Sequence, residues 1–206
     1  MKFAVALVLV AVASAMPSKQ SGDVCVSPEQ FVGRYTTYIH KDSGEESAVP
    51  GNMYYDWRHK RIRVDVQVEG VTYKSYLIYN EKVGYTVFGE RCYKYALTTP
   101  FTPVELPADA TLLESGRAGS SEHGLNVKRF HGKVLGVPFL ATVTADECIL
   151  VSSVGRKDDT TVIFSLLDVS RLEVTDDDFK RPTECVEVGN EKRSVEDVPK
   201  VPLPFL

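Results

Sequence analysis

Hydrophobic and polar residues alternate most clearly between residues 61 and 69. Ile62, Val64, Val66 and Val68 fall on one side of an extended chain, and charged or amide side chains occupy the positions between them. This period of two is typical of a β-strand with one buried and one solvated face. Two more strand-like runs follow after short turns, at residues 71–79 and 83–88. The three runs together predict an antiparallel meander.

The second half of the chain repeats this pattern of short strands. Strand-like runs occupy residues 125–130, 139–144, 148–154 and 160–167. Pro100, Pro103 and Pro107 interrupt strand pairing before them, because proline lacks the backbone N–H. Residues 108–115 predict a short helix, since good helix formers follow a proline and Gly116 ends the run. The fold class that follows is mainly β, an antiparallel sandwich or half-open barrel with one or two short helices.

The N-terminus has the pattern of a secretory signal peptide. Lys2 precedes an apolar run at residues 3–13, and Ala13-Ser14-Ala15 supplies the small residues of a cleavage site. The run is shorter than the roughly 20 residues that span a bilayer. We therefore expect cleavage after Ala15 and a secreted, extracellular protein. Residues 16–24 are expected to be flexible, 25–185 to form one β domain, and 186–206 to be a disordered, proline-containing tail.

Charge and cysteine content narrow the function further. With a net charge of −4, the protein lacks the positive charge expected of a nucleic-acid-binding protein. Cys25, Cys92, Cys148 and Cys185 are widely spaced, so neither the close pairs of a zinc site nor a C-x-x-C redox motif is present. In an oxidising compartment the four predict two disulfides, with three connectivities open.

Catalytic and metal-binding signatures are few. G-x-S-x-G, H-E-x-x-H and a glycine-rich phosphate loop are all absent from the sequence, so we expect no enzyme. The sequence specifies no cofactor. Calcium is the candidate cation, because Asp176, Asp177 and Asp178 could supply two or three of the six to eight oxygens that it takes. A solvated acidic loop is the alternative interpretation of these aspartates.

Aromatic residues are concentrated in the first meander, and packed core is their ordinary role. In a curved sheet the concave face can instead enclose an apolar cavity, which would bind a lipid-like molecule by surface burial. Alternation and side-chain size select the following pocket residues: Tyr55, Trp57, Ile62, Val64, Tyr76, Ile78, Tyr85, Val87, Phe139 and Phe164.

Several segments in order resemble the ependymin-related proteins, a family of secreted animal glycoproteins. The resemblance covers roughly residues 24–186, and the segments that carry it are Tyr54-Tyr55-Asp56, Arg61-Ile62-Arg63-Val64, residues 85–92, 108–119 and 141–152, and the closing Phe-x-x-Pro-x-x-Cys at 179–185. It implies two stacked antiparallel sheets around a deep apolar pocket, similar to bacterial lipoprotein carriers. It also implies lipid binding, a homodimer, association with calcium and matrix, and the disulfides Cys25–Cys148 and Cys92–Cys185.

The chain departs from the family pattern in its glycosylation signals. Asn52, Asn80, Asn126 and Asn190 all lack a Ser or Thr two residues on, so no N-glycosylation sequon is present. Calcium binding in the family is linked to glycans, and here it would depend on the aspartates. A lipocalin is a further alternative, because residues 31–35 (Phe-Val-Gly-Arg-Tyr) resemble that family's opening motif.

Two functions follow from these observations. The first is a carrier or sensor that binds a fatty-acid-like or other lipid-like molecule in an apolar pocket. The second is a matrix or cell-adhesion protein that binds collagen or another matrix component through calcium-dependent surface contacts, with Asp176–Asp178 as the site. Neither function involves a membrane-spanning segment or a nucleic acid.

Overall fold

The computed structural model describes residues 25–68, 70–101, 103–107, 109–134, 136–170 and 174–188. The predicted signal peptide (1–15), the N-terminal segment 16–24 and most of the predicted tail lie outside these described residues. The prediction of a disordered tail from residue 186 is wrong at its start, because Val186–Glu187 forms a short strand that pairs with Tyr93 and Lys94.

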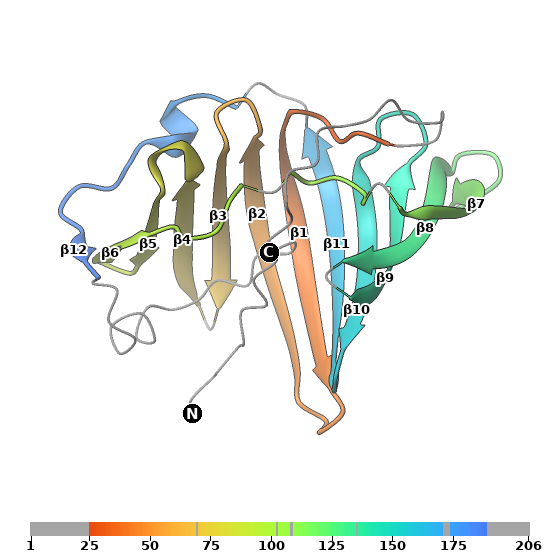
Figure 1. The fold of residues 1–206 in the computed structure, drawn as a ribbon, viewed down its shortest axis with the longest axis horizontal. Coiled ribbons are helices and arrows are strands. Elements are labelled where there is room, and N and C mark those ends of the chain that lie inside the picture. The colour runs from red at the N-terminus through yellow and green to blue at the C-terminus, as the bar shows by residue number, and fades with distance from the viewer. Residues whose placement is uncertain are drawn as a thin grey trace.

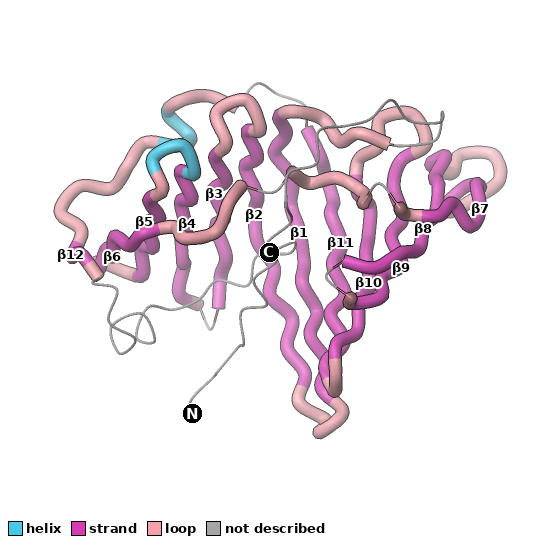
Figure 2. The backbone as a smooth tube through the Cα atoms, viewed as in Figure 1, coloured by secondary structure: helices cyan, strands magenta, loops and turns pink. Residues whose placement is uncertain are grey.

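Twelve strands form one continuous sheet in the described part of the chain (Figures 1 and 2). They are β1 (Gln30–Lys41), β2 (Glu46–Asp56), β3 (Arg61–Val68), β4 (Val71–Ile78), β5 (Val83–Phe88), β6 (Arg91–Ala96), β7 (Thr111–Ala118), β8 (Leu125–Val134), β9 (Val137–Thr144), β10 (Leu150–Lys157), β11 (Thr160–Ser170) and β12 (Val186–Glu187). Two 3-10 helices, η1 (Tyr79–Glu81) and η2 (Asp177–Phe179), complete the described elements.

The strand order is β12-β6-β5-β4-β3-β2-β1-β11-β10-β9-β8-β7. Neighbours pair antiparallel except for the parallel pair β12–β6. The fold is therefore mainly β, as predicted, but the expectation of two stacked sheets is wrong. The reason is β1, which pairs with β2 on one side and with β11 on the other. It thereby joins the meander β1–β6 to the meander β7–β11.

The predicted helix at residues 108–115 is also wrong, because β7 occupies Thr111–Ala118. The strand pairs with β8 from Thr111↔His131 to Ala118↔Leu125. Helix propensities differ by less than about 1 kcal/mol among ordinary residues, and this pairing outweighs them. The lipocalin alternative is also wrong. The strand order is linear, with β12 and β7 at its edges, so the described strands do not form a closed eight-stranded barrel.

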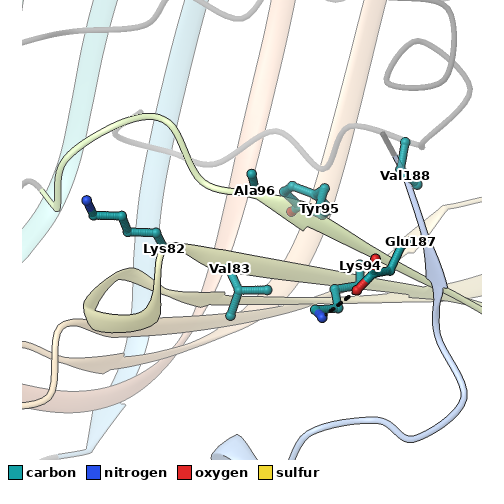
Figure 3. A pocket seen from close by; sticks show the side chains of 7 residues that line it. All are labelled: Lys82, Val83, Lys94, Tyr95, Ala96, Glu187 and Val188. Atoms are coloured by element: carbon teal, nitrogen blue, oxygen red, sulfur yellow. Dashed lines mark hydrogen bonds and ion pairs between the residues drawn. The ribbon is translucent and has the colours of Figure 1, made fainter. Parts of the chain in front are cut away.

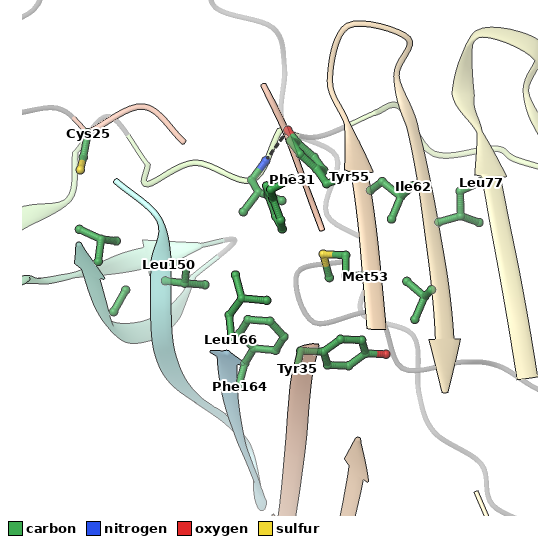
Figure 4. Close-up of a cluster of buried hydrophobic side chains, with 14 of the residues drawn as sticks. Cys25, Phe31, Tyr35, Met53, Tyr55, Ile62, Leu77, Leu150, Phe164 and Leu166 are labelled. Carbon is green, nitrogen blue, oxygen red and sulfur yellow. Dashed lines mark hydrogen bonds between the residues drawn. The ribbon is translucent and has the colours of Figure 1, made fainter. Parts of the chain in front are cut away.

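The sheet curves around a single large core. Buried side chains from β1–β4 and from β8–β11 belong to one hydrophobic cluster, so both halves face a common interior. Figure 4 shows side chains from the two halves converging between the strands. We call the face that bears this cluster the concave face. The prolines between β6 and β7 keep that connection extended, and it crosses the concave face from one end of the sheet to the other (Figure 1).

The opposite, convex face is partly covered by the chain between β11 and β12. Phe179 and Val174 pack with Ile78 in a second, smaller cluster. The guanidinium of Arg61 lies 4.4 Å from the centre of the Phe179 ring, a cation–π contact. The disulfide Cys92–Cys185 ties this covering segment to β6.

A buried carboxylate closes the turn between β2 and β3. Asp56 is fully buried and accepts hydrogen bonds from the Gln30 side chain, the His59 backbone and Arg61 Nε, and its other contact is His59 Nδ1 at 2.8 Å. Burial, the largest single influence, opposes ionisation of Asp56, but these hydrogen bonds together outweigh it and lower the pKa of the carboxyl.

Candidate functional site

The concave face is the candidate site, because aromatic and aliphatic side chains cover it nearly continuously. Strand alternation places these residues there, since every second side chain of each strand points to the same face. The buried members are Phe31, Tyr35, Met53, Tyr55, Ile62, Val64, Val66, Leu77, Tyr79, Phe130, Ala141, Val143, Leu150, Phe164 and Leu166. Figure 4 shows most of them between the two halves of the sheet.

Two glycines allow aromatic rings to lie flat on this face. Gly51 is the cross-strand partner of Tyr35, and a Cβ at Gly51 would come within 2.9 Å of the Tyr35 ring. Gly84 is the partner of Tyr95, and a Cβ there would come within 2.5 Å of that ring. Because glycine has no side chain, each ring covers the backbone of the neighbouring strand. The concave surface is thereby lined by ring faces at these positions.

An extended segment lies across the concave face. We call residues 97–101 and 103–107 the strap. Its Phe101 ring lies 6.1 Å from Tyr55 and 5.2 Å from Tyr79, measured between ring centres. The backbone N–H of Val104 donates a buried hydrogen bond of 3.1 Å to the Tyr55 hydroxyl. The backbone N–H of Leu97, at the start of the strap, donates a further hydrogen bond of 2.9 Å to the Lys82 carbonyl. The strap is therefore attached by apolar packing and by these two hydrogen bonds.

Buried hydroxyl groups interrupt the apolar surface in two places. Ser75 and Thr86 are 3.2 Å apart across β4 and β5, and Thr86 Oγ1 lies 3.5 Å from the Tyr95 hydroxyl. Elsewhere, Tyr35 and Thr37 present hydroxyls that are buried without a hydrogen-bond partner. Burial is the main cause that raises the pKa of Tyr35 and Tyr79, and it raises that of Tyr55 to about 12. These phenols are neutral at physiological pH.

The structure separates the predicted pocket residues into two sets. Tyr55, Ile62, Val64, Phe139 and Phe164 lie on the concave face, within its cluster or packed against it. The other five lie elsewhere. The alternation of side chains along β4 and β5 places four of them on the convex face: Tyr76, Ile78, Tyr85 and Val87. Trp57 lies in the β2–β3 turn, with 42% of its surface exposed.

Strand register explains this separation. Ile62 pairs with Leu77, so Ile78, which pairs with Arg61, points to the opposite face. A shift of one residue exchanges the faces of a whole strand, and alternation within each strand does not reveal the register between strands. The same register places Tyr85 opposite Tyr76 on the convex face.

Sequence reasoning missed several concave residues because it did not identify their strands. Phe31, Tyr35 and Met53 lie on β1 and β2, and Phe101 and Val104 lie on the strap. The alternation of Phe31, Gly33, Tyr35 and Thr37 was the available signal for β1.

The predicted calcium ligands do not converge in the structure. Asp176 Oδ1 accepts a hydrogen bond of 2.7 Å from Arg61, and Asp178 Oδ2 accepts from the backbone and the side chain of Thr175. Calcium takes six to eight oxygens around one point. Among the residues that the structure describes, no three His, Cys, Asp or Glu side chains form a group suited to a metal ion. Asp176 and Asp178 instead make hydrogen bonds that position the segment covering the convex face.

A separate cleft of about 340 Å³ lies beside β6 and the edge strand β12, away from the strap's contacts with Tyr55 (Figure 3). An ion pair of 2.7 Å between Lys94 and Glu187 crosses its wall. The lining residues are Lys82, Val83, Lys94, Tyr95, Ala96, Glu187 and Val188. Its mixed, partly charged lining distinguishes it from the concave face.

The fold and its concave face define a class of protein built on an open, curved β-sheet with an apolar interior. The model of the ependymin family matches residues 69–185, which is more than half of the chain. The chain therefore belongs to the ependymin family. A search of curated proteins finds no match to it.

Solved structures of low sequence identity are similar to this chain. An uncharacterized conserved protein from Thermus thermophilus is 12% identical, with a TM-score of 0.50, and the match covers 75% of this chain and 89% of that one. A LolA superfamily protein from Nitrosomonas europaea is 7% identical (TM-score 0.41; 76% and 92% covered). LprF from Mycobacterium bovis is 15% identical (TM-score 0.41; 71% and 87% covered). At 12% identity and a TM-score of 0.50, the similarity to the Thermus protein concerns the fold alone.

The cysteines form two disulfides, Cys25–Cys148 and Cys92–Cys185. This is the pairing that the family resemblance implied. The disulfides and the family are consistent with an extracellular protein. Among the described residues, no helix has the length and apolar character needed to cross a membrane.

Proposed function

We propose that this protein binds a lipid-like, apolar small molecule between the concave face of the sheet and the strap, and that it does not catalyse a reaction. The observation that carries the proposal is the concave face itself, which presents apolar side chains from both halves of the sheet and is crossed by an extended segment. Membership of the ependymin family, whose resemblance implied lipid binding, agrees with it.

The energetics of burial favour a long apolar ligand. Each buried methylene contributes about 0.8 kcal/mol, so a chain of about 14 methylenes contributes on the order of 10 kcal/mol before the entropic costs of binding. No directional contact is needed for this contribution. A flat surface of aromatic rings, such as Tyr35 over Gly51, suits a flexible acyl chain or a fused ring system equally well.

The strap is the element that a ligand must displace. Phe101 and Val104 occupy the concave face in this structure, where they contact Tyr55 and Tyr79. Ligand entry therefore requires the strap to separate from the sheet. At Phe101 and Val104, separation breaks apolar contacts and the hydrogen bond from Val104 to Tyr55, and binding energy from a buried chain can replace these contacts.

The experiment combines lipid analysis with matched variants. Protein purified from secreting cells is denatured, and extracted lipids are identified by mass spectrometry; the delipidated protein is then titrated with a fluorescent fatty-acyl probe. Phe101→Ala removes a strap contact with the concave face, whereas Trp57→Ala changes an exposed aromatic residue in a turn. We expect Phe101→Ala to change probe affinity or exchange rate and Trp57→Ala to leave both unchanged. Because Trp57 is the only tryptophan, probe fluorescence is a better signal than intrinsic fluorescence.

The proposal fails if the purified protein carries no lipid and the delipidated protein binds no probe. Equal effects of the two variants would place the bound probe outside the concave face.

A further inference from the structure

Two buried hydroxyl groups on the concave face have no hydrogen-bond partner. The Tyr35 side chain ends in an unpaired hydroxyl and Tyr35 is 1% exposed; Thr37 Oγ1 is also unpaired and Thr37 is 2% exposed. A buried polar group without a partner costs roughly 1–3 kcal/mol. Phenylalanine and valine have nearly the same shapes and would avoid this cost. The two hydroxyls are therefore unfavourable in the ligand-free fold.

Both hydroxyls come from the same face of one strand. Residues 35 and 37 are two positions apart on β1, so their side chains point in the same direction, toward the concave interior. Tyr35 belongs to the concave cluster, and Figure 4 shows its ring extending from β1 beside Phe164. The ring centres of Tyr35 and Phe164 are 5.7 Å apart. The hydroxyls thus lie within the site proposed for the apolar ligand.

Three other hydroxyls of this face have partners. Tyr55 accepts from the strap, and Ser75 and Thr86 pair with each other. Unpaired hydroxyls are therefore not a general property of the concave surface. Among the described residues, the fully buried side-chain N and O atoms without a partner are those of Tyr35 and Thr37, two positions apart on β1.

The cross-strand neighbours of the two residues are uncharged. The cross-strand neighbours of Tyr35 are Gly51 and Leu166, and those of Thr37 are Val49 and Phe164. The negative charge of Asp65 acts on the Tyr35 hydroxyl and contributes, after burial, to its raised pKa. An anionic group placed here would have no cation among these four neighbours, while Asp65, which is paired with Arg63, adds a residual negative charge. A neutral oxygen or hydroxyl meets neither penalty.

We propose that Tyr35 and Thr37 form a polar subsite that binds the uncharged head group of the ligand, a hydroxyl, ester or ketone oxygen at the end of an apolar body. This inference rests on the proposed function and specifies its ligand class: long-chain alcohols, acylglycerols or sterols in preference to fatty-acid anions. Each hydroxyl can donate one hydrogen bond to such an oxygen and accept one from a ligand hydroxyl.

The test compares two probes of equal chain length on the delipidated full-length protein. Oleyl alcohol and oleate, at pH 7.4, are titrated in competition with a bound fluorescent acyl probe. Tyr35→Phe and Thr37→Val remove the two hydroxyls singly and together. Thr36→Val is the matched control, because residue 36 lies on the same strand and points to the opposite face.

We expect the wild type to bind oleyl alcohol more tightly than oleate. Each single variant should lose roughly two- to tenfold in affinity for oleyl alcohol, the range of one hydrogen bond, with a smaller change for oleate. Without ligand, the same variants should melt at the wild-type temperature or above it, because an unpaired buried hydroxyl has been removed. Thr36→Val should bind both probes as the wild type does.

Two results would overturn the inference. Variants that melt at lower temperature and bind oleyl alcohol unchanged would show that the hydroxyls serve the fold alone, through a water molecule or an internal partner. A wild type that prefers oleate would exclude a neutral head group. In both cases probe binding persists and the proposed function stands, whereas a wild type that binds no probe removes the proposed function together with this inference.

Discussion

The hydrogen bond between the strap and the sheet gives the most direct test of how the concave face is closed. In Tyr55→Phe the ring remains, and with it the stacking on Phe31 at 4.9 Å and on Phe101 at 6.1 Å. The hydroxyl that accepts from the Val104 N–H is lost. Val104 is 8% exposed, so its N–H is left buried without a partner.

The expected loss in the free energy of unfolding is about 1–3 kcal/mol, the cost of a buried donor without an acceptor. For a chain of this length that corresponds to a decrease in melting temperature of about 2–12 °C. If the strap separates from the sheet independently of global unfolding, the exchange of the Val104 amide should accelerate by roughly 5- to 150-fold. Acyl-probe dissociation should accelerate as well, because the strap covers the proposed site.

Hydrogen–deuterium exchange of the strap, together with thermal denaturation, measures these effects. Tyr79→Phe is the control, since it removes a hydroxyl from the other ring that Phe101 contacts and leaves the Tyr55–Val104 bond in place. A Tyr55→Phe protein with wild-type stability and wild-type strap exchange would refute the reasoning. It would mean that water replaces the hydroxyl at no cost, and that packing alone holds the strap.

Two further predictions concern the frame around the site. The pKa of Asp56 is lowered in the folded state, so its contribution to stability is present above the ordinary aspartate pKa and is lost as the pH falls below it. Asp56→Asn should therefore be less stable than the wild type at pH 7, and the difference in the free energy of unfolding should shrink in denaturation curves measured toward pH 3. A difference that stays constant with pH would exclude the ionised Asp56–Arg61 pair as the source of the lost stability. Gly84→Ala should lose about 1–3 kcal/mol of stability, because its Cβ would meet the Tyr95 ring at 2.5 Å, whereas Gly116→Ala has open space and should change little in the same assay. Equal stability of the two alanine variants would show that the Tyr95 ring moves aside freely.

Much of the local structure was accessible from the sequence. The predicted strand at 61–69 corresponds to β3, Arg61–Val68, and the run at 83–88 coincides with β5, Val83–Phe88. Alternation is a property of one strand, so it survives in any tertiary arrangement. The prolines between β6 and β7 also indicated correctly that the connection is not a paired strand.

Local signals failed where pairing with a distant segment decided the outcome. Residues 111–118 have helix formers and a glycine stop, yet they form β7 because β8 offers a register of backbone partners. The same set of strands is compatible with two stacked sheets and with one curved sheet. Only the pairing of β1 with β11, which joins residues more than 100 positions apart in the chain, makes the sheet continuous.

The sequence by itself determined the mainly β fold class, the family, and the supply of aromatic and aliphatic residues for an apolar surface. The tertiary structure decided which of those residues share a face. Val64 and Tyr76 have similar local patterns, but the register between β3 and β4 turns Val64 to the concave side and Tyr76 to the convex side. The tertiary structure also brought the strap over Tyr55 and left the Tyr35 and Thr37 hydroxyls without partners. Composition fixes what a strand can bury, whereas register and long-range pairing fix where it is buried.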